Sequence, residues 1–285
     1  MTAGTAQTCS GLRPTHPLIN NRPMTIFENL RFAARVAAFA VNTIASLLGL
    51  ELSALVLFKR KRIDLVNIWL PRWARINLWI FGVEVDVRGP HAEDGRFYPA
   101  LGANGVGRIF VANHSSGLDI PIMLTVAEAH CISRHDLANW PLIGRGARRV
   151  GTLFVDRTSQ RSGASVLREV DQALAQGEGV AMFPEGTSFP GDEVHEFHNG
   201  AFNAARRAGA EIVPLGIVYG DDAAYFHKVT FMTHIKQFAV LKKLRVAVEI
   251  GAPLEVADAS NMETKDVARQ RVQELVQRAR ARLEG

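Results

Sequence analysis

Residues 108–126 read RIFVANHSSGLDIPIMLTV, and this stretch decides the fold class. Its first part, Arg108–Ala112, has the apolar composition of a short buried strand, and its last part, Ile120–Val126, has a helical pattern. The polar turn Asn113–Asp119 joins them. A strand end that opens into a helix through such a turn is where α/β sheets place their functional sites.

Short apolar runs of the same kind recur after residue 82. They predict further strands at Val83–Arg88, Thr152–Val155, Val180–Phe183, Ile212–Tyr219 and Leu244–Ile250. Helical patterns lie among these runs, one ending at Gly177 and one running from Ser260 to Leu283. The alternation predicts an α/β domain with a mixed, largely parallel sheet flanked by helices. Because Pro214 interrupts one run, we expect that strand to lie at an edge or to contain a bulge.

The N-terminal part of the chain contains a hydrophobic segment long enough to cross a membrane. Residues 1–31 form a basic lead that we expect to be disordered. The run from Phe32 to Phe58 is almost continuously apolar and exceeds the roughly 20 residues that span a hydrocarbon layer. A buried core helix is the alternative, but such helices seldom run this long. We therefore assign residues 32–82 to membrane-anchoring helices and residues 83–285 to the α/β domain. The first helix would either span the membrane or lie in its interface as a hairpin with the second.

Charged and aromatic residues after this segment predict its orientation. Lys59–Arg62 is a run of four cations, which favours the cytoplasmic side of a membrane. Trp69, Trp73 and Trp79 follow among Leu, Ile and Arg, a composition typical of an interfacial amphipathic stretch. We expect a membrane-associated protein whose catalytic domain lies on the cytoplasmic face.

The overall composition agrees with a membrane-attached globular domain. A mean hydropathy of +0.03 is too polar for a protein with many membrane spans. The net charge of +5 predicts anionic partners. Much of this charge adjoins the hydrophobic N-terminus, which favours an anionic membrane surface over nucleic acid. Cys9 and Cys131 lack paired spacing, which argues against a disulfide framework or a Cys-rich zinc site.

The turn at Asn113–Asp119 contains a candidate catalytic pair. Asp119 follows His114 by five positions, and a turn of this length can fold the carboxylate back onto the imidazole ring. The carboxylate would fix the tautomer of the ring, so that the other ring nitrogen can accept a proton. The alternative at this point is a histidine in a loop, with Asp119 capping the helix.

A second strand end, Gly151–Arg157, delivers an arginine. The planar fork of Arg157 suits a phosphate, because it donates two parallel hydrogen bonds. A surface ion pair between Asp156 and Arg157 would explain the same residues.

A third strand end is Phe183–Thr187. Glu185 could bind a hydroxyl or amide of a ligand, and Gly186 permits close approach to the backbone. A tight turn capped by Glu185 and Thr187 is the alternative.

Together these motifs resemble the glycerolipid acyltransferase family typified by 1-acylglycerol-3-phosphate acyltransferase. The resemblance covers about residues 83–256 and rests on Asn-His-x-Ser-x-x-Asp at Asn113–Asp119, Gly-x-x-Phe-Val-Asp-Arg at Gly151–Arg157, Phe-Pro-Glu-Gly-Thr at Phe183–Thr187 and Val-Pro-Leu at Val213–Leu215. One motif alone carries little weight, but four in this order are specific. They favour the catalytic interpretation of His114.

The resemblance implies a reaction and a role for each motif. His114 would be the general base and Asp119 its orienting partner. The acceptor site would comprise Arg157, which holds a phosphate, with Glu185, Gly186 and Thr187. The reaction would move a fatty-acyl group from acyl-CoA or acyl-carrier protein to the free hydroxyl of a lysolipid, most of all 1-acylglycerol 3-phosphate, giving phosphatidic acid. The family needs no metal or bound cofactor.

Two positions differ from the motif of family members that act on lysophosphatidate. Ser188 stands where such members carry an arginine, and His198–Asn199 stands where they carry a lysine. Another lysolipid, such as lyso-ornithine lipid or a lysophospholipid, is therefore the alternative acceptor. The arginines that could replace the missing charge are Arg134, Arg145, Arg148 and Arg149.

Two other protein classes fit the sequence less well. A non-catalytic membrane lipid-binding protein would keep the anchor and strands but has no use for a paired His114 and Asp119. A metal hydrolase could use these two with Asp156, yet no second histidine lies at ligand spacing.

Overall fold

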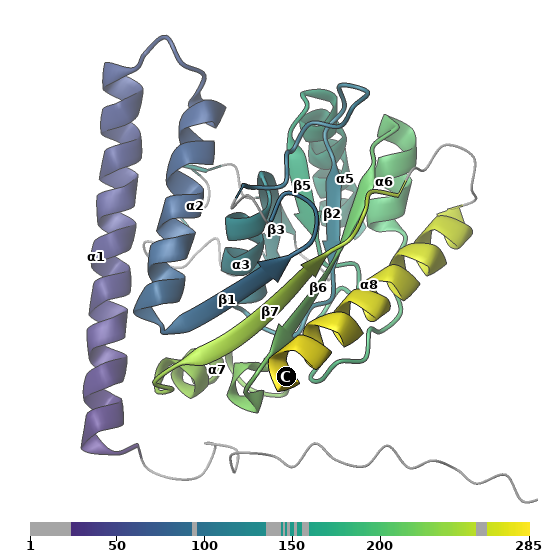
Figure 1. Cartoon of the computed structure of the whole chain (residues 1–285). Helices are drawn as coiled ribbons and strands as arrows, with labels where there is room; N and C mark the ends of the chain where they lie inside the picture. The colour runs from purple at the N-terminus through teal and green to yellow at the C-terminus, as the bar shows by residue number, and fades with distance from the viewer. Residues whose placement is uncertain are drawn as a thin grey trace, which may run out of the picture.

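The computed structural model describes residues 24–92, 96–134, 144, 146, 149–150, 153–155, 160–254 and 261–285. In this part of the chain, seven strands form one sheet in the order β1-β7-β6-β2-β5-β3-β4 (Figure 1). Their bounds are β1 (Val83–Arg88), β2 (Ile109–Ala112), β3 (Ala129–Arg134), β4 (Leu153–Val155), β5 (Gly179–Met182), β6 (Ile212–Tyr219) and β7 (Leu244–Ile250). Neighbouring strands are parallel except β6 and β7, which are antiparallel. The predicted mixed, largely parallel sheet is confirmed.

Helices cover both faces of this sheet (Figure 1). Their bounds are α1 (Ile26–Val56), α2 (Arg62–Ile80), α3 (Asp119–Val126), α5 (Gln160–Ala175), α6 (Gly200–Ala208), α7 (Phe231–Ala239) and α8 (Asn261–Glu284). Along β2, Phe110 and Ala112 join a core with α2 and α3, whereas Ile109 and Val111 join a second core with α5, α6 and α8. Because β2 is buried on both faces, only its ends can present side chains to a ligand.

All six predicted strands are present, each within one residue of its expected ends. β3 was not predicted, because its sequence AHCISR mixes polar and charged residues and follows α3 after two residues. The nine-residue helices α6 and α7 were also missed.

The prediction for Pro214 is wrong. Its strand β6 is central in the sheet, between β2 and β7, and is buried along its whole length. The residue is tolerated because it lies opposite Gly251, one position beyond the last residue of β7. Gly251 donates its N–H to the carbonyl of Pro214, so the missing N–H costs one hydrogen bond at the end of the ladder.

Helix α1 begins at Ile26, inside the segment expected to be a disordered lead. Thr25 and Glu28 form a capping box, in which each side chain accepts the backbone N–H of the other residue. The predicted boundary at residue 31 is therefore wrong. The capping signal lies upstream of the apolar run that set the boundary.

Helices α1 and α2 pack side by side as a hairpin along the α/β domain (Figure 1). The indole N–H groups of Trp69 and Trp73 donate to hydroxyls of Ser53 and Thr43 on α1, at 3.1 and 3.0 Å. These two tryptophans therefore hold the hairpin together, while Trp79 is 79% exposed. The interfacial interpretation thus fits Trp79 better than the other two.

Both ends of α1 contact the rest of the protein. Near its start, Arg31 and Arg35 donate to backbone carbonyls at the end of α7. Near its other end, Glu51 accepts from Arg62 and Arg149 at 2.9 and 2.6 Å. In the described residues, α1 is the one helix long and apolar enough to cross a membrane, and only 11% of its most apolar window is buried. A core helix would be mostly buried, so that alternative fits α1 poorly.

Candidate active site

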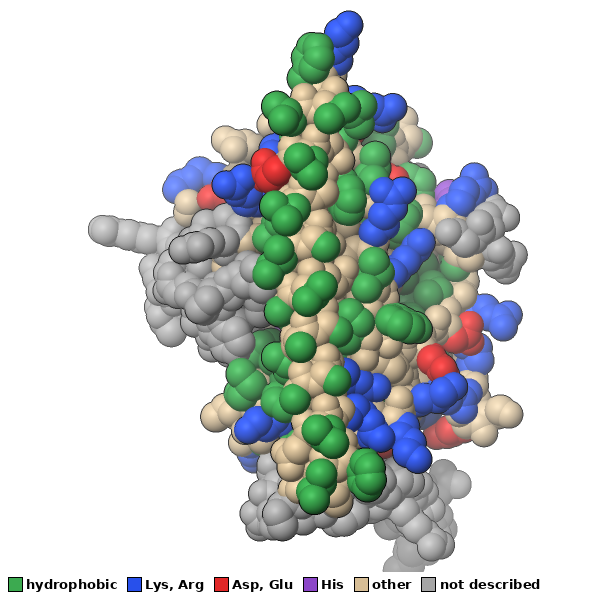
Figure 2. Space-filling view, turned by 90° about the vertical axis from the view of Figure 1, so that its left-hand side faces the viewer, with side chains coloured by type: hydrophobic (Ala, Val, Ile, Leu, Met, Phe, Trp, Pro, Cys, Tyr) green, Lys and Arg blue, Asp and Glu red, His purple; other side chains and the backbone are tan. Residues whose placement is uncertain are grey.

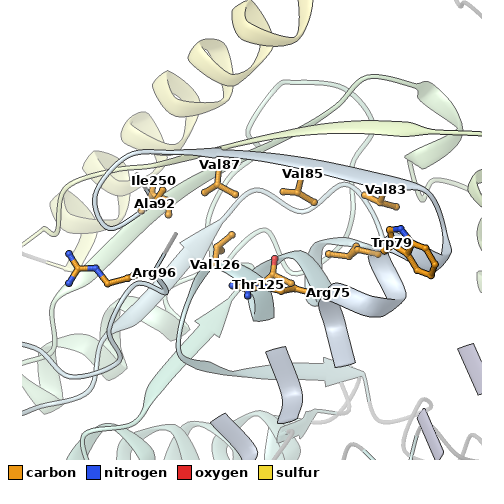
Figure 3. A pocket seen from close by; sticks show the side chains of 11 residues that line it. Arg75, Trp79, Val83, Val85, Val87, Ala92, Arg96, Thr125, Val126 and Ile250 are labelled. Atoms are coloured by element: carbon orange, nitrogen blue, oxygen red, sulfur yellow. The ribbon is translucent and has the colours of Figure 1, made fainter. Parts of the chain in front are cut away.

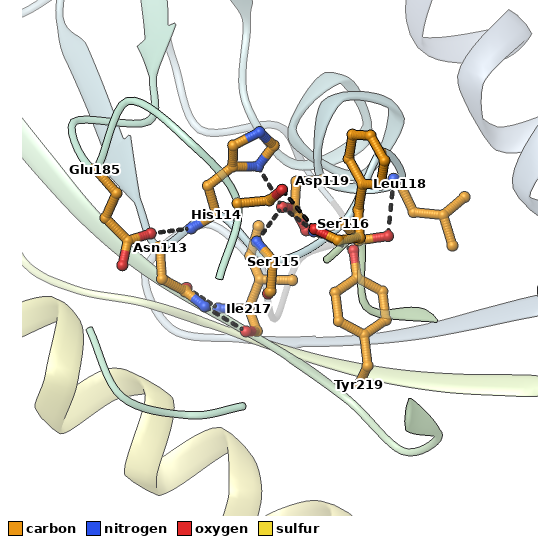
Figure 4. A network of polar contacts seen from close by, with 12 residues as sticks. Asn113, His114, Ser115, Ser116, Leu118, Asp119, Glu185, Ile217 and Tyr219 are labelled. Atoms are coloured by element: carbon orange, nitrogen blue, oxygen red, sulfur yellow. Dashed lines mark hydrogen bonds and ion pairs between the residues drawn. The ribbon is translucent and has the colours of Figure 1, made fainter. Parts of the chain in front are cut away.

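His114 and Asp119 meet at the carboxyl end of β2 (Figure 4). Nδ1 of His114 lies 2.7 Å from Oδ2 of Asp119. The Asp119 side chain is fully buried at the start of α3, and the His114 side chain keeps 12% of its surface exposed. The structure therefore brings the predicted pair together, with the imidazole as the accessible member.

The other contacts of Asp119 determine which nitrogen of His114 carries the proton. Backbone N–H groups of Ser115 and Ser116 donate to Oδ2 at 2.8 and 2.9 Å, and the Tyr219 hydroxyl donates to Oδ1 at 2.5 Å. A carboxylate surrounded by donors acts as an acceptor, so the contact with His114 places the proton on Nδ1. Nε2 of His114 then has a free lone pair and can accept a proton.

An asparagine side chain ends β2 and lets the turn leave the sheet. The amide of Asn113 accepts from the N–H of Ile217 at 2.8 Å and donates to its carbonyl at 2.9 Å. The amide thus replaces a strand residue opposite β6, and the main chain is free to turn outward at His114. Asn113 is part of the recognised motif, but its role was not predicted.

The segment after β5 holds the backbone of His114. Its N–H donates to Oε2 of Glu185 at 2.5 Å, and its carbonyl accepts from Phe189 at 2.9 Å. The imidazole also stacks on Phe183, with ring centroids 4.5 Å apart. Motifs about 70 residues apart therefore set the orientation of one ring.

Glu185 is a buried carboxyl group behind His114. It is 4% exposed, and its second oxygen accepts from the N–H of His195 at 2.8 Å. Burial raises its pKa to about 7, although the two N–H donors oppose this shift. The geometry gives Glu185 a positioning role, and its predicted role in acceptor binding stays a prediction.

Glu185→Gln is expected to change how stability depends on pH. Because the folded-state pKa of Glu185 lies above the ordinary value of 4.5, its stabilising contribution is full below about pH 4.5 and is lost as the pH rises to about 7. Relative to the non-titrating variant, the wild type should lose up to about 3 kcal/mol of unfolding free energy as the pH rises across that window. Thermal unfolding of both proteins below and above the window measures it. A constant difference would contradict the raised pKa.

The residues after Glu185 form a tight turn. Gly186 has φ of +73°, in the left-handed region that favours glycine, and a Cβ there would lie 2.8 Å from the ring of His198. Thr187 is exposed. The hydroxyl of Ser188 donates to the carbonyl of Phe226 at 2.7 Å, so this side chain is held by a neighbouring loop. A glycine at position 186 thus allows both the backbone conformation of the turn and the close approach of the His198 ring.

The predicted arginines can be placed only in part. Arg157 and Asp156 lie outside the described residues, so the phosphate-binding role of Arg157 stays a prediction. Arg145, Arg148 and the side chain of Arg134 also lie outside them. Arg149 is described, and its guanidinium binds Glu51 on α1. That contact assigns Arg149 to the helix hairpin.

Two further residues of the site were missed. Burial raises the pKa of Tyr219 well above its ordinary value, so its hydroxyl stays a donor to Asp119. Burial lowers the pKa of His234, on α7, to about 4, so its neutral Nε2 accepts from the N–H of Gly117 at 3.0 Å. The sequence contained a hint of the Tyr219 contact, because Tyr219 ends a predicted strand and a buried phenol hydroxyl needs a hydrogen-bond partner. No sequence feature predicted the role of His234, because helix α7 itself was not predicted.

Comparisons with known proteins identify the family of this chain. Residues 99–218, which include His114, Asp119 and Glu185, match the acyltransferase family. A 1-acyl-sn-glycerol-3-phosphate acyltransferase of Neisseria gonorrhoeae is 27% identical over 236 residues, which cover 73% of this chain and 91% of that protein. A lyso-ornithine lipid O-acyltransferase of Rhodobacter capsulatus is 30% identical over 255 residues, which cover 84% and 87%.

A solved structure shares the fold. The crystal structure of the 1-acyl-sn-glycerophosphate acyltransferase of Thermotoga maritima matches with a TM-score of 0.64 and 21% identity, covering 89% of this chain and 98% of that one. The family match and the Rhodobacter relative show that the chain belongs to the glycerolipid acyltransferase family typified by 1-acylglycerol-3-phosphate acyltransferase, and it is an acyltransferase.

Proposed function

We propose that this protein transfers a fatty-acyl group from acyl-CoA or acyl-carrier protein to the free hydroxyl of a lysolipid. The contact between His114 and Asp119 carries the proposal, because it leaves Nε2 as the proton acceptor. Nε2 takes the hydroxyl proton while the alcohol oxygen attacks the thioester carbonyl carbon. The C–S bond then breaks, and the proton passes from His114 to the sulfur. A thioester is already activated, so the proposed reaction uses no acyl-enzyme, metal or bound cofactor.

The first proposed acceptor is 1-acylglycerol 3-phosphate, which would become phosphatidic acid. The four family motifs and the Neisseria relative support it. Arg157 is the residue we propose for its phosphate, by two parallel hydrogen bonds.

A specific observation favours a second acceptor, lyso-ornithine lipid. Ser188 replaces a family arginine, and its hydroxyl is bound to the carbonyl of Phe226. His198 lies against Gly186 near the place of a family lysine. A site with fewer cations suits a head group without a phosphate monoester, and the Rhodobacter relative carries the matching name.

An acceptor panel with a labelled acyl donor distinguishes these proposals. The full chain in detergent is given 1-acylglycerol 3-phosphate, lyso-ornithine lipid or lysophosphatidylcholine, with acyl-CoA and acyl-carrier protein in separate arms. We expect the highest kcat/KM with 1-acylglycerol 3-phosphate, and Arg157→Ala to raise KM for that acceptor most. A higher kcat/KM with lyso-ornithine lipid would replace the first acceptor by the second. No transfer to any of them would reject the lysolipid proposal.

We further propose that α1 attaches the protein to the surface of one membrane leaflet. Exposed apolar side chains recur every three or four residues along much of α1 and form an apolar stripe: Val41, Ile44, Leu48, Leu52 and Leu55. Figure 2 shows apolar side chains along α1, with Lys and Arg side chains beside them. Both ends of α1 contact the same domain, which favours a helix lying in the interface. With the cationic Lys59–Arg62, this supports a location on the cytoplasmic face.

Leu48→Glu is expected to weaken binding to anionic vesicles by at least about tenfold, because it removes roughly 1.5–3 kcal/mol of apolar burial and adds a negative charge. Val267→Glu is the matched control, since Val267 is 47% exposed on α8 while Leu48 is 59% exposed. Vesicle flotation measures both variants. An equal loss of vesicle binding in Leu48→Glu and Val267→Glu would argue against the stripe as the attachment surface.

A further inference from the structure

A groove runs along β1, between this strand, α2 and α3 (Figure 3). Its volume is about 280 Å³. Val83, Val85 and Val87 form one wall, because alternate residues of a strand point to the same side. Leu78 from α2 and Val126 from α3 also line the groove. The groove is therefore an apolar slot that follows the edge strand of the sheet.

Two arginine side chains line this groove. Among the described residues that line it, those with charged side chains are Arg75 and Arg96. The carboxylates of β1 point to the other side of the strand, where Glu84 binds Lys243 at 2.6 Å and Asp86 lies 3.3 Å from Arg282. An apolar slot that contains arginine side chains suits an amphiphile that has an anionic head and a hydrocarbon chain.

The groove opens beside the surface that we assign to the membrane. Trp79 lines the groove and is 79% exposed, and its neighbour on α2, Ile76, is 44% exposed. Arg75 directly precedes Ile76 on α2, and its guanidinium carbon lies 4.6 Å from the ring centroid of Phe97. These side chains belong to α2, which packs against α1, the helix that carries the apolar stripe. A lipid in the bilayer surface would reach Arg75 directly.

We propose that this groove binds one anionic phospholipid from the bilayer, with its phosphate on Arg75 and one acyl chain along Val83, Val85 and Val87. The span from Val83 to Val87 is about 13 Å, enough for a stretch of extended chain. The lining residues do not include the turn Asn113–Asp119, so the site is separate from the catalytic pair. Binding needs no acyl transfer, so the inference rests on the proposed membrane attachment and is independent of the proposed reaction.

Native mass spectrometry of the full chain in detergent tests the proposal, with dioleoylphosphatidylglycerol and dioleoylphosphatidylcholine supplied in equal amounts. We expect wild type to retain one phosphatidylglycerol and Arg75→Gln to lose affinity for it by about fivefold or more. Arg72→Gln is the matched control, because Arg72 is exposed on α2 but does not line the groove. Val85→Trp, which fills the slot, should lose the lipid, and Val85→Ala should retain it. Val87→Trp replaces Val85→Trp if that variant does not fold.

Three results would overturn the proposal. Equal losses in Arg75→Gln and Arg72→Gln would mean that diffuse positive charge attracts the lipid. Undiminished retention in the tryptophan variants would mean that no chain enters the groove. Unchanged phosphatidylglycerol binding with a raised KM for the acyl donor in the tryptophan variants would assign the groove to a substrate chain.

Discussion

His114→Ala is expected to lower turnover by about 10²- to 10⁴-fold, the usual contribution of a positioned general base. The substitution removes Nε2, the nitrogen whose lone pair is left free by the contact with Asp119. The fold should persist, because Asp119 keeps its bonds from Ser115, Ser116 and Tyr219. Initial rates with labelled acyl donor, thermal unfolding and vesicle binding are to be measured on the same preparation.

The control for this prediction is another histidine in the same domain. His227 is exposed in the loop before α7, and His227→Ala should leave the rate unchanged. Near wild-type turnover in His114→Ala would remove the general-base assignment. A lost rate together with a lost thermal transition would show damage to the fold, and the milder His114→Gln would then carry the test.

The catalytic pair could be predicted from the sequence because its contact is local. His114 and Asp119 lie in one turn between a strand and a helix, and five positions are enough to fold the carboxylate onto the ring. The supporting contacts are tertiary. Glu185 and Tyr219 reach this turn from 71 and 100 residues away, and spacing along the chain carries no information about such distances.

The same distinction explains the errors in the fold. The central strand β6 is buried along its whole length, and its apolar, β-branched composition identifies it as a strand. The position of β6 in the sheet depends instead on which strands pair with it, so the proline rule alone placed it wrongly at an edge. β3 is held between β4 and β5 by backbone bonds that its polar sequence does not signal.

Asp119→Asn should lower turnover on the order of 10³- to 10⁴-fold, as the equivalent change does in Ser-His-Asp triads. An amide is neutral and has both a donor and an acceptor end. It cannot stabilise the imidazolium that forms on His114, and with its NH₂ group toward the ring it selects the tautomer whose Nε2 is protonated. Tyr219→Phe keeps the carboxylate and removes one hydrogen bond, so it should cost about 1.5–3 kcal/mol of stability and a smaller part of the rate.

The double variant separates a catalytic partnership from two independent effects. If Asp119 acts only through His114, adding Asp119→Asn to His114→Ala should lower the rate little further, because residues that act as a unit are strongly non-additive. If the rate loss of the double variant equals the product of the two single losses, Asp119 supports the site independently of His114, for example by holding the backbone of Ser115 and Ser116. Asp119→Asn at near wild-type turnover would reduce the carboxylate to a cap of α3. The ring of His114 would then depend on Phe183 and Glu185 for its orientation.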